Sequence, residues 1–136
     1  GFFVLLDAAD VHDDESAVAD GGGAVALDEG EDFVVKQVRQ ARANRDLAVD
    51  ALRQMPGVNF EVPKGAFYLF FGIDGMTDSA ATVRRLIDEA KVGIAPGGTF
   101  GEGGEGFLRI CYLKDPAELT EALNRLGNWL KSNRPV

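Results

Sequence analysis

A single arginine interrupts an apolar, strand-like run near the end of this sequence. The run is Phe107–Tyr112, and the loop directly before it, Pro96–Gly106, contains six glycines. A buried guanidinium without a partner costs several kcal/mol, so Arg109 needs a reason to be there. It either takes an edge-strand position or a structural ion pair, or it offers a planar fork that binds a carboxylate or phosphate bidentately. Spacing alone leaves these alternatives open, and in the functional one the glycine loop is a mobile cover for a ligand.

The loop itself matches a dinucleotide pattern, but its context does not. Gly101, Gly103 and Gly106 satisfy G-x-G-x-x-G. That mechanism requires a helix N-terminus immediately after the glycines to receive a pyrophosphate, whereas here a strand follows. The Gly-Lys-Ser/Thr of a phosphate-binding loop is also missing. We therefore interpret the loop as a connection between strands.

Other reactive side chains do not form a recognisable constellation. The segment His12–Glu15 fits no metal-ligand spacing, and runs of acids are usually solvated, so we expect no metal. Because His12 is the sole histidine, a Ser-His or Cys-His mechanism has no credible base. Cys111 is typical of a small core residue in a strand. We expect no catalytic residue in this chain.

Composition bounds the class of protein. The chain has 136 residues, one cysteine and a net charge of −8. Ten acids and no lysine or arginine fall within residues 1–32, while the remainder contains 14 basic and 12 acidic residues. This local acidity argues against nucleic acid as a partner. No apolar run approaches the roughly 20 residues of a membrane helix, and the single cysteine favours a reducing, cytoplasmic setting.

Periodicity predicts one α+β domain after the acidic front. A long helix over 28–55 ends at Pro56-Gly57, and Asp115-Pro116 begins a last helix. Between them we expect strands, a helix and further strands, with bounds at 58–62, 66–73, 78–90, 92–95 and 106–112. The order α-β-β-α-β-β-α predicts a small sheet with helices packed on one face. We divide the chain into an acidic front, 1–23, and a folded domain, 24–136.

Four segments of this domain, in this order, resemble the C-terminal part of class I/II pyridoxal-phosphate aminotransferases of fold type I. They read "PGV" (56–58), "PKGAFYLF" (63–70), "VGIAPGGTFG" (92–101) and "FLRICY" (107–112). Each segment is weak evidence, but the four at proper separations are specific.

The resemblance implies the small, substrate-binding domain of an enzyme that transfers an amino group between an amino acid and a 2-keto acid. In that family the arginine of the last strand binds the substrate α-carboxylate, and the matching residue is Arg109. Phe67, Tyr68 and Phe100 match positions on the substrate side and are candidate wall residues. Intact relatives are homodimers with pyridoxal 5′-phosphate as cofactor.

The departures from the family are equally informative. Family members are much longer, and a larger domain provides the Schiff-base lysine and the cofactor-binding groups. No lysine of this chain matches that motif, so we expect no bound cofactor and no transamination by the chain alone. A stand-alone carboxylate-binding or regulatory α+β domain is the alternative, and an inactive translation product is a third possibility.

The acidic front suggests one more hypothesis. Read one base downstream, degenerate codons for Ala9–Asp20 permit a Thr-Thr-Asn-Pro-type segment that the family has before this domain. Residues 1 to about 22 would then be translated out of frame, and an ordinary acidic tail is the alternative. In either case we expect the front to be poorly packed.

Overall fold

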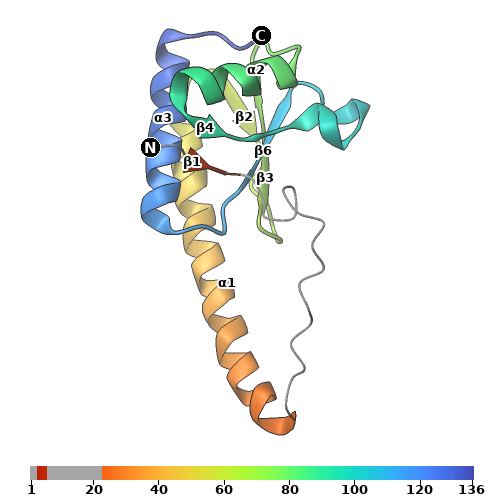
Figure 1. Cartoon of the computed structure of the whole chain (residues 1–136), viewed down its shortest axis with the longest axis vertical. Coiled ribbons are helices and arrows are strands. Elements are labelled where there is room, and N and C mark those ends of the chain that lie inside the picture. Colours follow the sequence, from red (N-terminus) through yellow and green to blue (C-terminus); the bar gives the residue numbers. More distant parts are fainter. Residues whose placement is uncertain (1–2, 6–22) are drawn as a thin grey trace.

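The computed structural model describes residues 3–5 and 23–136, and its centre is a four-stranded antiparallel sheet (Figure 1). The strand order is β2-β3-β6-β5. The strands are β2 (Val58–Phe60), β3 (Tyr68–Ile73), β6 (Phe107–Cys111) and β5 (Ala95–Pro96). Because β3 and β6 are the longest strands and lie in the middle, they form the framework of the sheet.

The two faces of this sheet differ sharply in burial. On β3 and β6, one set of alternating side chains is buried in the core: Leu69, Phe71, Ile73, Leu108 and Ile110. Most of the intervening side chains are exposed or half-buried, namely Tyr68, Phe70, Phe107 and Arg109, whereas Cys111 at the end of β6 is buried. Successive side chains of a strand point to opposite faces, so the second set shares the outer face.

The helices cover the buried face. Helix α1 (Gly23–Arg53) packs along α3 (Pro116–Ser132), and α2 (Ser79–Arg85) continues into a π-helical turn, Leu86–Ala90 (Figure 1). Asp78 caps α2 by accepting from Ala81 N, and Asp115 caps α3. The predicted α+β class, with helices on one face of a small sheet, is confirmed.

The buried side chain of Asn44 joins α1 to the end of β6. Its Nδ2 donates to the carbonyls of Tyr112 and Lys114 at 2.8 and 2.7 Å. Two backbone acceptors that emerge from the sheet are thus satisfied inside the core, where an unmade hydrogen bond is costly. Asn44 consequently fixes how the long helix crosses the sheet.

Two details differ from the predicted order. The strand expected at 92–95 is divided into β4 (Val92–Gly93) and β5, which belong to different sheets. Strand β1 (Phe3–Val4) was not predicted, and it pairs with β4 in parallel.

Residues 3–5 of the acidic front are therefore packed, contrary to expectation. Leu5 is only 1% exposed and belongs to the core. Its amide donates to Gly93 O at 2.7 Å, and its carbonyl accepts from Cys111 N at 2.8 Å. Parallel pairing with distant residues leaves no local pattern in the sequence, which is why β1 escaped prediction. Residues 6–22, including His12–Glu15 and most of the proposed out-of-frame segment, lie outside the described residues, and the division into two segments stays a prediction.

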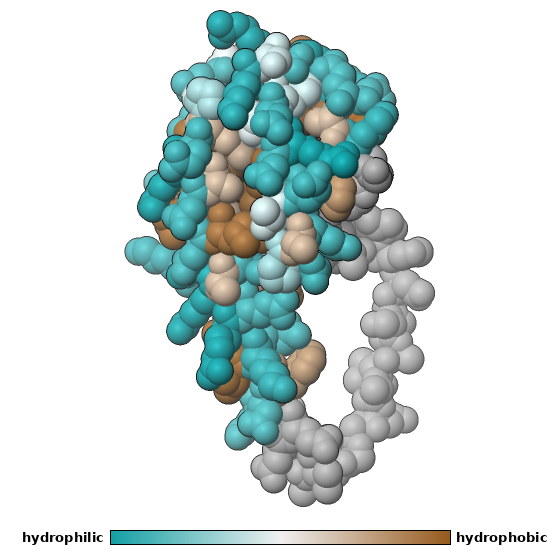
Figure 2. Space-filling model, turned by 90° about the vertical axis from the view of Figure 1, so that its left-hand side faces the viewer, coloured by the Kyte–Doolittle hydropathy of each residue, from teal (hydrophilic) through white to brown (hydrophobic). Residues whose placement is uncertain are grey.

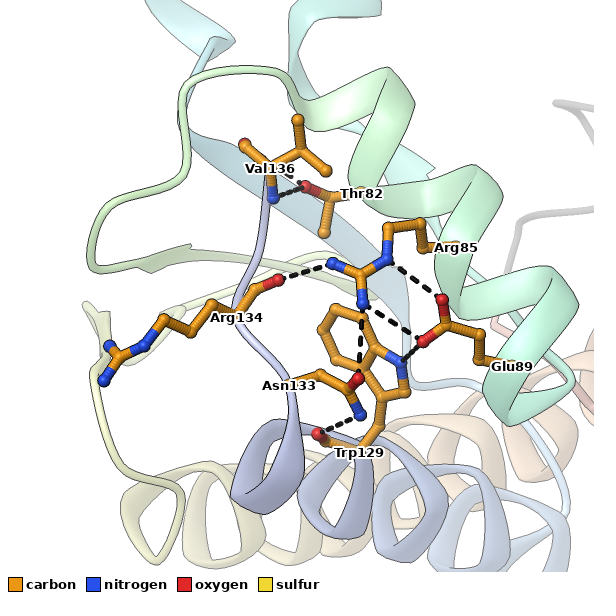
Figure 3. Close-up of polar contacts among 7 residues, drawn as sticks. All are labelled: Thr82, Arg85, Glu89, Trp129, Asn133, Arg134 and Val136. Carbon is orange, nitrogen blue, oxygen red and sulfur yellow. Dashed lines mark hydrogen bonds and ion pairs between the residues drawn. The ribbon is translucent and has the colours of Figure 1, made fainter.

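The last residues of the chain are tied to α2 by a polar cluster (Figure 3). The Arg85 guanidinium pairs with Glu89, lies 5.0 Å from the Trp129 ring centroid, and donates to Arg134 O at 2.7 Å. Trp129 Nε1 also donates to Glu89 Oε2 at 2.6 Å, and these bonds lower the pKa of Glu89. Val136 N donates to Thr82 Oγ1 at 3.0 Å. These contacts attach the C-terminal segment to α2.

The N-terminal half of α1 extends away from the sheet as a stem (Figure 1). Hydrophobic surface is visible along this stem in Figure 2, and four of its apolar residues are more than two-fifths exposed: Phe33, Val34, Val35 and Val38. Within the described residues, no helix is both long and apolar enough to cross a membrane.

Leu5 directly follows β1 and is buried in the core, so truncating its side chain should lower the stability of the domain. We expect Leu5→Ala to reduce the free energy of unfolding by about 2–5 kcal/mol, the usual cost of a cavity at a buried leucine. Urea denaturation followed by circular dichroism measures this. Val62→Ala, at a residue that is 43% exposed, is the control and should change little. An equally small effect for Leu5→Ala would mean that the front does not pack as described.

Candidate functional site

Arg109 lies on the interior strand β6, with a paired strand on each side. It is opposite Phe70 of β3 and opposite Ala95 of β5. The edge-strand alternative for this arginine is therefore wrong. Its half-buried side chain belongs to the outer face of the sheet, away from the helices.

Two aromatic rings contact the Arg109 guanidinium. The Cζ atom of Arg109 lies 4.3 Å from the ring centroid of Tyr68 and 4.0 Å from that of Phe100. Both distances are well within the roughly 6 Å range of cation–π attraction. Stacking engages the flat faces of a guanidinium, whereas its N–H donors point outward in its plane. Two rings at these distances restrict the positions that the Arg109 side chain can take.

Phe70 belongs to the same cluster and was not predicted. Its ring meets Phe100 edge to face, with centroids 5.8 Å apart and an interplanar angle of 80°. The alternation of β3 contained the signal, because Tyr68 and Phe70 are two residues apart and must share a face. The structure thus brings together Arg109, Tyr68, Phe100 and Phe70.

Phe67 is placed elsewhere. It precedes β3 and lines a separate pocket of about 280 Å³ against α1, together with Arg42, Arg45 and Tyr112. Tyr112 is buried there and donates its hydroxyl proton to Ala66 O at 2.8 Å. Burial raises the pKa of the Tyr112 phenol, and the charge of Arg45 acts in the opposite direction. The structure does not bring Phe67 together with the other predicted wall residues.

The glycine loop is compact. It forms two short 3-10 turns, Gly97–Phe100 and Glu102–Gly104, and the first of them delivers Phe100 to Arg109. The two turns touch through their backbones: a Cβ added to Gly104 would lie 2.0 Å from Gly97 O. Gly97 is equally confined, since a Cβ there would lie 2.1 Å from Gly104 O. These glycines are required by close backbone approach.

An open groove of about 880 Å³ adjoins the cluster on the outer face. Tyr68, Phe70 and Phe107 form its wall on the sheet, and Lys64 and Glu61 on the β2–β3 connection form its rim. Tyr68 and Phe70 are shared by the groove and the Arg109 cluster. Apolar surface for the body of a ligand thus lies next to the guanidinium.

The lysines of this chain are distributed over separate helices, turns and connections. The cofactor's chemistry needs a lysine beside the ring and a set of groups for its phosphate. All five lysines are exposed or half-buried, on helices, turns or loops: Lys36, Lys64, Lys91, Lys114 and Lys131. Nor does any group of three or more potential metal ligands occur among residues 3–5 and 23–136. Cys111 is buried, in agreement with a core role.

Sequence comparison finds aminotransferases among the relatives of this chain. The chain is 34% identical over 112 residues to an aspartate aminotransferase of Pyrococcus horikoshii, covering 82% of this chain and 29% of the relative. It is 37% identical over 103 residues to an LL-diaminopimelate aminotransferase of Nitratidesulfovibrio vulgaris, covering 76% and 26%. The chain is related to the pyridoxal-phosphate aminotransferases. No protein-family profile matches it.

Solved aminotransferase structures share the fold. An aromatic aminotransferase from Pyrococcus horikoshii superposes with a TM-score of 0.71 at 33% identity, over 76% of this chain and 28% of that one. An aspartate aminotransferase from Thermotoga maritima gives 0.66 at 37% identity, over 72% and 25%. This aminotransferase-related chain therefore spans little more than a quarter of its relatives' length, consistent with a C-terminal fragment.

The backbone contact between the two loop turns predicts a contrast between neighbouring glycines. Gly104→Ala should lower the free energy of unfolding by about 1–3 kcal/mol, because its methyl group overlaps Gly97 O. Gly103→Ala is the matched control, since a Cβ there meets nothing within 4 Å. Thermal unfolding of both variants makes the comparison. Equal stabilities would show that the two turns are not in contact.

Proposed function

We propose that this chain is the substrate-binding C-terminal domain of a pyridoxal-phosphate-dependent aminotransferase. Within it, Arg109 binds the α-carboxylate of the amino acid or 2-keto acid. Tyr68 and Phe100 hold the guanidinium plane, and Phe70 supports the ring of Phe100.

One observation carries this proposal. The guanidinium of this interior-strand arginine lies within 4.3 Å of two ring centroids, and one of the two rings comes from the glycine loop. A planar cation whose orientation is fixed in advance loses little rotamer freedom when it binds a planar anion. Bidentate hydrogen bonds to one carboxylate then orient the adjacent α-carbon, as positioning for a reaction requires.

The remaining parts of the reaction belong, in this proposal, to the rest of a longer protein. Since the described lysines form no cofactor site, pyridoxal phosphate is held by residues outside this chain, and the residues here only bind and orient substrate. The whole protein acts as a homodimer in the cytoplasm on amino acids and 2-keto acids.

Removal of the guanidinium should weaken binding of the carboxylate. Isothermal titration of the chain with a 2-keto acid should show binding that Arg109→Ala weakens by about tenfold to a hundredfold, the value of one or two hydrogen bonds to a charged group. Arg109→Lys should recover only part of the loss because an ammonium cannot bind bidentately.

Arg84→Ala is the control for a general loss of positive charge, since Arg84 is an exposed arginine of α2. Its affinity should equal that of the unaltered chain. If Arg109→Ala binds as well as Arg84→Ala does, then Arg109 has a structural role, such as an ion pair, and the proposed site is wrong.

The division of labour between this chain and the rest of the protein is tested by an activity assay. The chain with added pyridoxal phosphate, an amino acid and a 2-keto acid should form no new keto acid above a protein-free blank. A full-length aminotransferase in the same assay is the positive control. Turnover that is lost in Arg109→Ala would show that the chain is catalytically complete.

A further inference from the structure

The Glu105 carboxylate joins the glycine loop to the start of α2. Glu105 Oε1 accepts a 2.6 Å hydrogen bond from Ser79 N at the start of α2 and a 3.1 Å bond from Gly106 N. Ser79 Oγ in turn accepts from Gly98 N at 3.2 Å. We call these three hydrogen bonds among Glu105, Ser79, Gly98 and Gly106 the Glu105 junction. Although Glu105 itself is exposed, Ser79 is only 1% exposed, so the junction reaches into the core.

The junction is tightly packed. A Cβ added to Gly98 would lie 2.5 Å from Glu105 Oε2 and 3.3 Å from Ser79 Oγ. The carboxylate therefore fills the space that any side chain at position 98 would need. Hydrogen bonds from both backbone amides lower the pKa of Glu105, while the nearby charge of Asp78 acts in the opposite direction.

The same junction leads directly to the candidate site. Gly98 belongs to the 3-10 turn that ends at Phe100, and the Phe100 ring lies 4.0 Å from Arg109 Cζ. Only two peptide units thus separate the anchored Gly98 from the ring that covers the guanidinium. A displacement of Gly98 moves Phe100 away from Arg109 and from Phe70.

We propose that Glu105 is a positioning residue of this site: through Ser79 and Gly98 it holds Phe100 over the guanidinium of Arg109. Glu105 touches neither Arg109 nor the ligand in this account. Its effect on carboxylate affinity rests on the function proposed above, whereas its effect on the Phe100–Arg109 contact does not.

Protonation of Glu105 should release the junction. A carboxyl group with a lowered pKa in the folded state contributes stability above its ordinary value of 4.5 and loses it as the pH falls through the lower folded pKa. Phe100 should therefore leave Arg109 in acid below pH 4.5. Asp78 is a second carboxylate near Glu105, and it caps α2 by accepting from Ala81 N. Variants of Glu105 alone are therefore needed to assign the acid transition to Glu105.

The experiment compares Glu105→Gln with Glu102→Gln, a change to the other exposed glutamate of the loop. Amide hydrogen exchange measures protection at Ser79 and Gly98, and NMR contacts between the Phe100 ring and the Arg109 side chain report their stacking. In Glu105→Gln we expect exchange at Ser79 to rise several-fold, the Phe100–Arg109 contacts to weaken, and their acid transition to vanish. Glu102→Gln should retain all three properties, and Glu105→Asp should recover part of them. Ser79→Ala should release Gly98 and weaken the Phe100–Arg109 contacts, while the amide of residue 79 stays protected by Glu105.

Titration with a 2-keto acid separates this inference from the proposed function. Affinity should fall about threefold to tenfold in Glu105→Gln, a smaller loss than for Arg109→Ala. If Arg109→Ala binds normally while Glu105→Gln still loses the Phe100–Arg109 contacts, the proposed function fails and the positioning role stands. Unchanged contacts and an unchanged acid transition in Glu105→Gln, with circular dichroism confirming a folded chain, would overturn the positioning role.

Discussion

The cation–π contact of Arg109 with the rings of Tyr68 and Phe100 is the interaction on which the candidate site depends. It places a charged group on an interior strand between Leu108 and Ile110, which are buried in the core. The aromatic faces lower the cost of removing the guanidinium from water without engaging its in-plane donors. One ring comes from the adjacent strand and is fixed by sheet register, whereas the other comes from the glycine loop and depends on the fold of that loop.

This difference explains the architecture around the site. The β3–β6 pairing needs only the helices on its buried face, where Asn44 ties α1 to the end of β6. The glycine loop is stabilised by contacts of its own: the backbone contact of Gly97 with Gly104 and the hydrogen bonds to Glu105. We infer that a rigid strand supplies the cation and a separately anchored loop supplies its cover.

Sequence reasoning succeeded where the determinants are local. The helix start at Asp115-Pro116 and the strand-like run around Arg109 predict elements that the structure contains, and with them the fold class. It missed contacts made across long separations, such as β1 with β4 and Glu105 with Ser79, because pairing over such distances leaves no periodic signal. Phe67 was grouped with Tyr68 through the family resemblance, although strand alternation sends neighbouring side chains to opposite sides.

The most direct measurement of the central claim observes the Arg109 guanidinium itself by NMR while a 2-keto acid is added. The account predicts a saturable shift of the Arg109 Nε–H signal, accompanied by shifts of the Tyr68 and Phe100 ring signals, and no such response to the corresponding amide. A guanidinium signal that stays constant while the acid binds elsewhere on the chain would contradict the account.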